Sequence, residues 1–289
     1  MKLAITVGDP RGIGPEVVAA ALGDASVSSA AEYVIVGPHG TSISPDIAIG
    51  TWRPGGSAAE AGRLAGAAVA RATELALAGE VAGIVTAPLD KLALLSGGYD
   101  YPGHTEMLAA LTRSRVAMML ASDRLRVVLA TTHIPLRDVP NAVTGAAIIE
   151  AARITREGLR SWFDVAEPRL ALCALNPHAG DGGRFGDEDD RILAPAAREA
   201  GLAGPFPADT VFVRAIRGEF DAVIAPYHDV GMTAIKVASF GEAVNVTLGL
   251  PFPRTSPDHG TAIDIAGRGI ADPSSMIAAV LMCATIAQS

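Results

Sequence analysis

Three histidines occupy the same kind of position, a few residues after an apolar run that is typical of a buried strand. The runs VVLATTH, LALCALNPH and AVIAPYHD lead to His133, His178 and His228. Ligands of α/β proteins bind at the carboxyl ends of strands, so three such residues indicate one site better than three separate core histidines. Neutral imidazoles without thiolates suit Zn²⁺, Co²⁺, Ni²⁺ or Mn²⁺, and three protein ligands leave positions open for a substrate. We therefore expect a catalytic metal site.

Two further polar clusters each allow two interpretations. The stretch NPHAGDGGRFGDEDD (176–190) either brings its glycine-rich backbone close to a ligand or forms a plain turn before a helix that starts near Glu188. In YPGHTEMLA (101–109), His104 and Thr105 precede a helical pattern. They either donate hydrogen bonds to an anion near the helix N-terminus, or Thr105 is an ordinary N-cap.

The two ends of the chain carry glycine-containing loops that match no general nucleotide motif. GDPRGIGPEVVAAAL (8–22) lacks the Lys-Ser/Thr of a P-loop and the glycine spacing of a dinucleotide fingerprint. A helix that begins near Pro15 and Glu16 is the simpler interpretation. NVTLGLPFPRTSPDHGTAIDIAG (245–267) reads as a strand followed by a polar loop with Arg254, His259 and Asp264, and spacing alone does not make it a cofactor site.

Elements that would position these residues alternate along the chain, as strands joined by crossover helices do, so the predicted class is α/β. Helices are predicted over 57–79 and 142–163, which are Ala-rich and amphipathic, and over 276–287, which is apolar throughout. The predicted strands are KLAITVG, YVIVG, VAGIVTAP, RVVLATTH, RLALCALNPH, DAVIAPYH and AVNVTLGLP.

Composition excludes several classes of protein. A net charge of −8 argues against a nucleic-acid surface, so an anionic ligand has to be held by a few local cations. Cys173 and Cys283 lie in apolar surroundings without C-x-x-C spacing, which argues against disulfides and fits a reducing cytoplasm. MKLAITVGDPRG reaches Asp9 too early for a signal peptide, and the 276–287 run is too short to span a bilayer. We expect a cytoplasmic protein that binds no membrane.

Taken together, the motifs resemble the 4-hydroxythreonine-4-phosphate dehydrogenase family (PdxA-like), in order and largely in spacing, from Ile5 to Gly267 and through the terminal helix. The motifs that carry the resemblance are GDPRGIGPE, TAPLDK, GHTEML, TTHIPLRD, LNPHAGDGGRFG, PADTVF, YHDVGMTAIK and NVTLGLPFPRTSPDHGTAIDIAG.

The resemblance implies a two-lobed α/β/α fold similar to isocitrate and isopropylmalate dehydrogenases, with the active site in the cleft between the lobes. We expect residues 1–115 plus 255–289 to form the first lobe. Residues 116–254 would form the second, which carries the metal and the dimer contacts. The family is a homodimer whose active site uses residues of both subunits.

The family's site residues match particular positions here. The implied metal ligands are His133, His178 and His228, for Zn, Co, Ni, Mn or Mg. The implied substrate contacts are His104, Thr105, Lys236, Asn245 and Arg254. The implied NAD or NADP contacts are His259, Gly260, Thr261 and Asp264. Lys236, Asp209 and Asp229 are the expected proton-transfer and orienting residues. The expected reaction is oxidation of a small phosphorylated hydroxy acid followed by decarboxylation, most simply of 4-hydroxythreonine 4-phosphate in pyridoxal phosphate biosynthesis.

Departures from the family leave alternatives open. The segment over 37–57 is shorter than the family usually carries, and Arg11 and Arg184 replace a small residue and a histidine. Threonate or erythronate 4-phosphate dehydrogenases and cis-dihydrodiol dicarboxylate dehydrogenases share most of the motifs. A metal-dependent hydrolase or isomerase that needs no dinucleotide is an alternative of another class. The retained histidines, Lys236 and Arg254 argue against a binding protein without activity.

Overall fold

The computed structural model describes residues 1–239 and 241–288. Contacts within the chain divide it into two compact units, Met1–Arg115 with Val244–Ser289 (unit 1) and Val116–Ala243 (unit 2). Unit 2 thus ends at Ala243, before a strand, and not at the expected residue 254. Both units combine a sheet with helices, which confirms the α/β class. Within the described part of the chain, no helix is long and apolar enough to cross a membrane.

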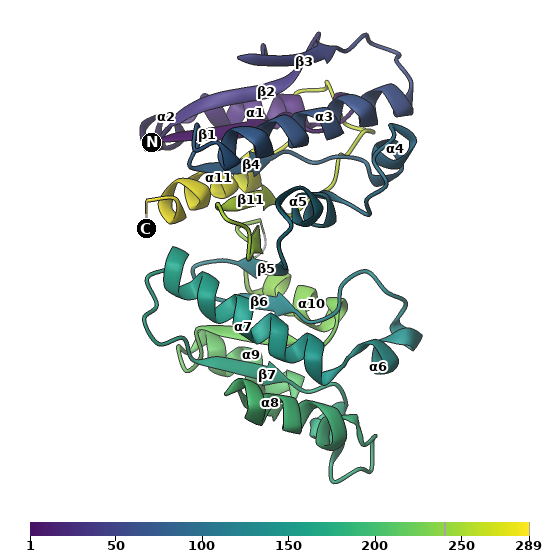
Figure 1. The fold of residues 1–289 in the computed structure, drawn as a ribbon, viewed down its shortest axis with the longest axis vertical. Coiled ribbons are helices and arrows are strands. Elements are labelled where there is room, and N and C mark those ends of the chain that lie inside the picture. Colours follow the sequence, from purple (N-terminus) through teal and green to yellow (C-terminus); the bar gives the residue numbers. More distant parts are fainter. Residues whose placement is uncertain (240, 289) are drawn as a thin grey trace. The chain divides into compact units, whose positions relative to one another are not determined.

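The sheet of unit 1 has the order β3-β2-β1-β4-β11-β10 (Figure 1). Most of its neighbours are parallel, while β10 and β11 form an antiparallel pair. The carboxyl ends of β1, β2 and β4 therefore share one edge. The strands are β1 (Lys2–Thr6), β2 (Glu32–His39), β3 (Ile47–Thr51), β4 (Gly83–Thr86), β10 (Val244–Leu248) and β11 (Arg254–Pro257).

Helices of unit 1 begin where local sequence signals place them. The Ser57 hydroxyl accepts a hydrogen bond from the Glu60 amide at 3.1 Å and caps α3. The helices at 57–79 and 276–287 are confirmed as α3 and α11, within a few residues at each end. The terminal helix is tied to the sheet because Thr255 Oγ1 donates to Ala279 O at 2.7 Å. The helices are α1 (Gly14–Leu22), α2 (Ala25–Ala30), α3 (Ala58–Leu77), α4 (Lys91–Ser96), α5 (His104–Thr112) and α11 (Ser274–Ile286).

The sheet of unit 2 has the order β5-β6-β9-β7-β8. β5 and β6 are antiparallel, and β6, β9, β7 and β8 run parallel. All four residues of both β7 and β9 are buried, which fits central strands covered on both faces. The strands are β5 (Ala117–Ala121), β6 (Arg126–Leu129), β7 (Leu170–Cys173), β8 (Ala203–Phe206) and β9 (Ala222–Ala225).

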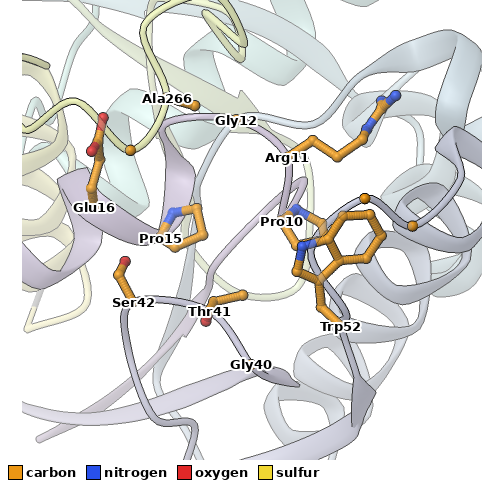
Figure 2. A pocket seen from close by; sticks show the side chains of 13 residues that line it. Pro10, Arg11, Gly12, Pro15, Glu16, Gly40, Thr41, Ser42, Trp52 and Ala266 are labelled. Carbon is orange, nitrogen blue, oxygen red and sulfur yellow. The ribbon is translucent and has the colours of Figure 1, made fainter.

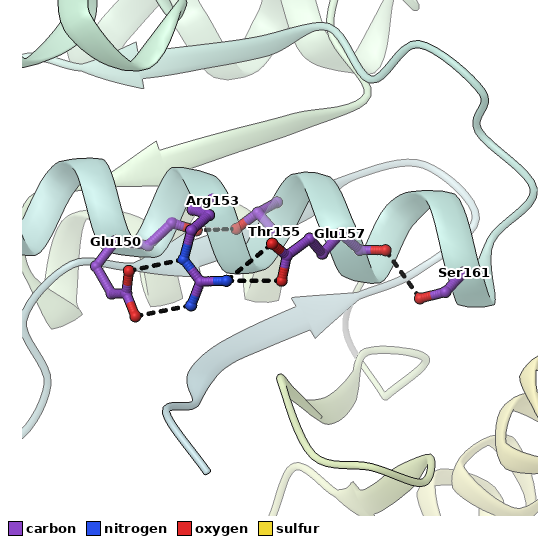
Figure 3. A network of polar contacts seen from close by, with 6 residues as sticks. Glu150, Arg153, Thr155, Glu157 and Ser161 are labelled. Atoms are coloured by element: carbon purple, nitrogen blue, oxygen red, sulfur yellow. Dashed lines mark hydrogen bonds and ion pairs between the residues drawn. The ribbon is translucent and has the colours of Figure 1, made fainter.

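The long helix α7 of unit 2 confirms the prediction over 142–163. Its exposed face carries an ion-pair network in which Arg153 contacts Glu150 and Glu157, both at 2.8 Å (Figure 3). Exposed pairs of this kind contribute little stability, so burial of its apolar face holds the helix to the sheet. The helices are α6 (Val139–Ala142), α7 (Gly145–Trp162), α8 (Ala194–Ala200), α9 (Ala208–Ile216) and α10 (His228–Ala238), with short 3₁₀ turns at Leu136–Asp138 and Pro177–Gly180 and a π-helical turn at Asp189–Leu193.

Four strands escaped the sequence prediction, namely β3, β5, β8 and β11. β11 matters most, because the polar tetrapeptide RTSP was assigned to a loop and instead forms a fully buried strand between β4 and β10. Its flanking prolines and lack of apolar alternation hid it. As a consequence, the Arg254 side chain belongs to the interior of unit 1.

Candidate functional site

The carboxyl ends of β6, β9 and β7 meet at one edge of the unit 2 sheet, because β9 lies between the other two and all three are parallel. Backbone contacts continue past the strands, since the Ala130 amide donates to Ala225 O at 2.9 Å. Thr131 Oγ1 also donates to Pro226 O at 2.7 Å. The segments leading to His133 and His228 are therefore held side by side.

His133 and His228 are close neighbours, with ring centroids 5.4 Å apart. His228 is the first residue of α10, and its Nδ1 lies 2.7 Å from Asp229 Oδ1. A carboxylate bound to Nδ1 fixes the ring so that Nε2 is the atom available to a ligand. Two adjacent imidazoles, one of them oriented in this way, have the chemistry of half a transition-metal site.

His178 lies on an exposed loop of unusual backbone geometry. His178, Ala179 and Asp181 have φ values of 54°, 55° and 46°, the left-handed region that costs energy for residues other than glycine. The loop is anchored by Asp189, whose side chain is 1% exposed. Its two carboxylate oxygens accept the Leu175 and Asn176 amides at 2.8 and 2.9 Å.

The three histidines do not form a metal site within one chain. Among the described residues, no group of three or more His, Cys, Asp or Glu is placed to hold a metal ion. The two cysteines offer no thiolate, because burial raises the pKa of both Cys173 and Cys283 to about 12. The chain itself thus supplies the His133–His228 pair.

Arg254 is a buried cation with hydroxyl partners. Its side chain is 1% exposed, and it donates from Nε to Thr86 Oγ1 at 3.2 Å and from Nη1 to Thr247 Oγ1 at 3.0 Å. Among the described residues no carboxylate forms an ion pair with it. Burial is the main cause that lowers its pKa to about 10. A buried positive charge without a carboxylate partner favours the binding of an anion.

Two other expected substrate residues carry buried polar atoms without a partner in unit 1. His104 Nε2 and Asn245 Oδ1 both lack a hydrogen-bond partner. Burial, then Arg254 and Lys91, hold the pKa of His104 well below its usual value. Unpaired buried groups are rare in proteins and often mark a ligand site. The cap of α5 is Gly103, so Thr105 lies inside the first turn and is not the N-cap.

The predicted dinucleotide loop is tied to the first loop of the chain. The Ile13 amide donates to Thr261 O at 2.9 Å. His259 Nδ1 lies 3.0 Å from Gly260 O, while its Nε2 is buried without a partner. Asp264 is exposed. The loop therefore offers an unused imidazole nitrogen and an accessible carboxylate, groups that fit hydroxyl and amide donors or acceptors of a nucleotide.

Lys236 and Asp209 are exposed at helix ends, in the last turn of α10 and the first turn of α9. Sequence reasoning missed Asp189, Thr86 and Thr247, which anchor the His178 loop and the Arg254 guanidinium. Asp189 is one acid among several in FGDEDD, so no signal in one sequence separates it from its exposed neighbours. Thr86 is the first residue of the motif TAPLDK, and its hydroxyl at the end of a predicted strand was a signal that the sequence contained.

Comparison with known proteins decides the family. Residues 8–283 match the family model described as "Pyridoxal phosphate biosynthetic protein PdxA". The chain belongs to this family. It is 41% identical to a 4-hydroxythreonine-4-phosphate dehydrogenase of Desulfosudis oleivorans, over 97% of this chain and 94% of the relative. Members of this kind are dehydrogenases, so the chain is an oxidoreductase that acts on a CH–OH group.

Solved structures agree with this assignment. The crystal structure of 4-hydroxythreonine-4-phosphate dehydrogenase from Klebsiella pneumoniae is similar with a TM-score of 0.87 and 40% identity, covering 99% of both chains. A terephthalate 1,2-cis-dihydrodiol dehydrogenase from Burkholderia xenovorans has a TM-score of 0.67 and 27% identity, over 99% of this chain and 98% of the other. Isocitrate dehydrogenase from Methylococcus capsulatus, at 18% identity and a TM-score of 0.52 over 98% and 83% of the two chains, shares the fold.

Proposed function

We propose that this protein oxidises 4-hydroxythreonine 4-phosphate with NAD(P), with loss of carbon dioxide, in pyridoxal phosphate biosynthesis. The observation that carries the proposal is the match along the whole chain to relatives of that name. The dihydrodiol dehydrogenase alternative has lower identity and a lower TM-score. No feature of the structure favours a hydrolase or isomerase over an oxidoreductase.

In unit 1, the residues that lack partners fit a phosphorylated substrate. Arg254 supplies a buried positive charge, and His104 supplies an imidazole nitrogen that no protein group occupies. We assign these two residues, with Thr105 and Asn245, to the substrate's anionic groups. A planar guanidinium matches the geometry of phosphate and carboxylate oxygens.

In unit 2, the His133–His228 pair would hold a divalent cation. Such a cation, when bound, lowers the pKa of a coordinated hydroxyl and stabilises negative charge on that oxygen. Asp229 keeps the His228 Nε2 directed at the ligand. We assign Lys236 to accept the proton of the substrate hydroxyl and later to return a proton to the product after carbon dioxide leaves. A nicotinamide, when bound, would accept the hydride from the substrate carbon that carries this hydroxyl. Asp209 is assigned to orient a neighbouring group.

We further propose that His178 of a second copy completes the metal site, so that the working protein is a homodimer. The observations behind this step are the pairing of His133 with His228 and the exposed position of His178 on its anchored loop. Three imidazoles with open positions would then match a catalytic metal site.

An assay of NAD(P) reduction tests the reaction. The cobalt- or zinc-loaded protein should reduce NAD or NADP with 4-hydroxythreonine 4-phosphate, and less effectively with erythronate or threonate 4-phosphate. Turnover of a cis-dihydrodiol dicarboxylate alone would overturn the proposed substrate. Turnover of a substrate without any nicotinamide cofactor would point to a hydrolase or isomerase.

Mixing two inactive variants tests the second copy. His133→Ala and His178→Ala should each be inactive alone. If His178 acts across the dimer, a heterodimer of the two variants keeps one intact site, so an exchanged equal mixture recovers about a quarter of the wild-type activity, as expected for random pairing. Recovery of no activity, with exchange verified by mass spectrometry, would place all three histidines in one chain.

A further inference from the structure

Lys91 is a cation beside the predicted substrate residues of unit 1, and the proposed function gives it no role. It is the first residue of α4, on the segment that follows Thr86 at the end of β4, and its side chain is exposed. The side chain reaches the start of α5, because a Cβ on Gly103 would lie 3.7 Å from Lys91 Cε. Burial, then Arg254 and the Lys91 charge, lower the pKa of His104. The amine of Lys91 therefore lies near this imidazole.

Arg11, by contrast, is a cation of unit 1 that is already neutralised. It lines a pocket at the carboxyl ends of β1 and β2 together with Glu16 and Trp52 (Figure 2). It donates to both carboxylate oxygens of Asp9, from Nε at 3.1 Å and from Nη2 at 2.7 Å, and lies 3.7 Å from Asp90. Arg11 thus offers no free charge, and it engages the carboxylate that directly precedes the lysine in the sequence.

No carboxylate neutralises Lys91. Among the residues that the structure describes, it takes part in no ion pair. Asp90 caps α4 and accepts the Ala93 amide at 2.6 Å. Glu106 lies in the first turn of α5, and its charge partly opposes the effect of burial on the pKa of Arg254. Glu106 can offset one of the two cations, Lys91 or Arg254, and leaves the other without compensation.

The N-terminus of α5 adds further donors at the same place. The helix has nine residues, and its cap residue, Gly103, has no side chain that could bind the first amides. Such amides carry a partial positive charge and bind anions well. His104, the first helical residue, holds its Nε2 buried without a partner. An imidazole nitrogen of this kind can donate a hydrogen bond to an anionic oxygen.

We propose that Lys91 binds the phosphate group of the substrate, together with the α5 N-terminus and Arg254, and thereby selects phosphorylated over non-phosphorylated hydroxy acids. This inference rests on the proposed function, because it adds a residue to the binding site of that substrate. A phosphate monoester carries a charge of about −1.5 to −2 at pH 7, so it gains more from a second cation than a carboxylate does. Arg254 supplies the interior cation and Lys91 the cation on the solvent side.

Nuclear magnetic resonance of the lysine amines gives a readout that does not depend on turnover. The chain contains only Lys2, Lys91 and Lys236, so single Lys→Arg variants assign every lysine resonance after reductive methylation with carbon-13. Methylation keeps the positive charge of the amine. In the zinc-loaded full-length protein, inorganic phosphate should shift the Lys91 resonance saturably, acetate should shift it less, and the exposed Lys2 should respond to neither. A Lys91 resonance that moves no more than that of Lys2 would overturn the inference.

Enzyme kinetics then separates this inference from the proposed function. Lys91→Gln should raise the KM for 4-hydroxythreonine 4-phosphate about ten-fold with little change in kcat, because the phosphate is bound equally in the ground state and the transition state. Lys91→Arg keeps the charge and should retain most of the affinity, and Lys2→Gln is the matched control that should change nothing. Normal turnover by Lys91→Gln with an unchanged KM would reject the phosphate contact and leave the function standing. A shift of the Lys91 resonance by phosphate, without turnover of any tested substrate, would reject the function and keep the phosphate site.

Discussion

Replacement of Arg254 by methionine should stabilise unit 1 although it removes three hydrogen bonds. Burial lowers the pKa of Arg254 from its usual value to about 10, a fall of about two units, and one pKa unit corresponds to about 1.4 kcal/mol. The buried charge therefore costs about 3 kcal/mol. Loss of the hydrogen bonds costs about 1 kcal/mol for each of the two threonine hydroxyls, those of Thr86 and Thr247, or about 2 kcal/mol in all. The variant should be more stable by about 1 kcal/mol at pH 7.

The pH dependence has a definite sign. Below pH 10 the guanidinium is protonated in both the folded and the unfolded chain, so the full penalty is present at neutral pH. As the pH rises above about 10, the folded protein releases the proton before the unfolded chain does, and the penalty falls. The stability advantage of Arg254→Met should therefore be constant from pH 6 to 9 and shrink only in strong alkali.

Urea unfolding followed by Trp52 fluorescence in a Trp162→Phe background reports on unit 1. Thr86→Val is the matched control, because it removes an acceptor and keeps the charge, and it should destabilise by about 1–3 kcal/mol. Inorganic phosphate should raise the midpoint of the parent protein and not that of Arg254→Met, if the guanidinium binds the substrate's phosphate. If Arg254→Met is less stable than the parent protein by about 2 kcal/mol or more, the reasoning is refuted, because the surrounding groups would then compensate the cost of burying the charge.

Further variants probe the unit 2 site and the thiols. Asp189→Asn replaces one of two acceptor oxygens by a donor, so it should lower the free energy of unfolding in urea by about 1–3 kcal/mol. Amide hydrogen exchange in the His178 loop should also become faster. Exchange no faster than in the parent would show that Asp189 does not anchor the loop. Asp229→Asn should reduce cobalt affinity about ten-fold in equilibrium dialysis, and unchanged affinity would show that this carboxylate does not orient His228. Cys173 and Cys283, with pKa values of about 12, should resist iodoacetamide at pH 8 until urea unfolds the protein, whereas rapid labelling of the native protein would contradict their burial.

Hydrophobic pattern predicted the elements that depend on it. Long amphipathic helices and buried parallel strands leave strong signals, and the strand-end rule selected His133 and His228, which lie together. The rule does not say how far a loop extends beyond its strand. His178 follows the same kind of strand end, yet its loop continues through left-handed residues to an exposed position.

The burial of polar residues could not be predicted from a single sequence. RTSP has neither apolar alternation nor β-branched repetition, so its place at the centre of a sheet follows from tertiary pairing with β4 and β10. The same holds for the burial of Arg254, since arginine in sequence is normally a surface residue. Spacing also gave no hint that Trp52 and Glu16 would face one pocket from two distant segments.

The late arrival of β11 in the chain has a consequence for synthesis on the ribosome. Unit 2 is one continuous stretch, so it can begin to fold while the C-terminal segment is still being made. Until then the first 115 residues have an open edge at β4, because its neighbour β11 is synthesised only after the whole of unit 2. An unpaired, buried-type strand edge attracts other nascent strands. The interval before β11 is made is therefore when unit 1 is most exposed to pairing with the wrong strand.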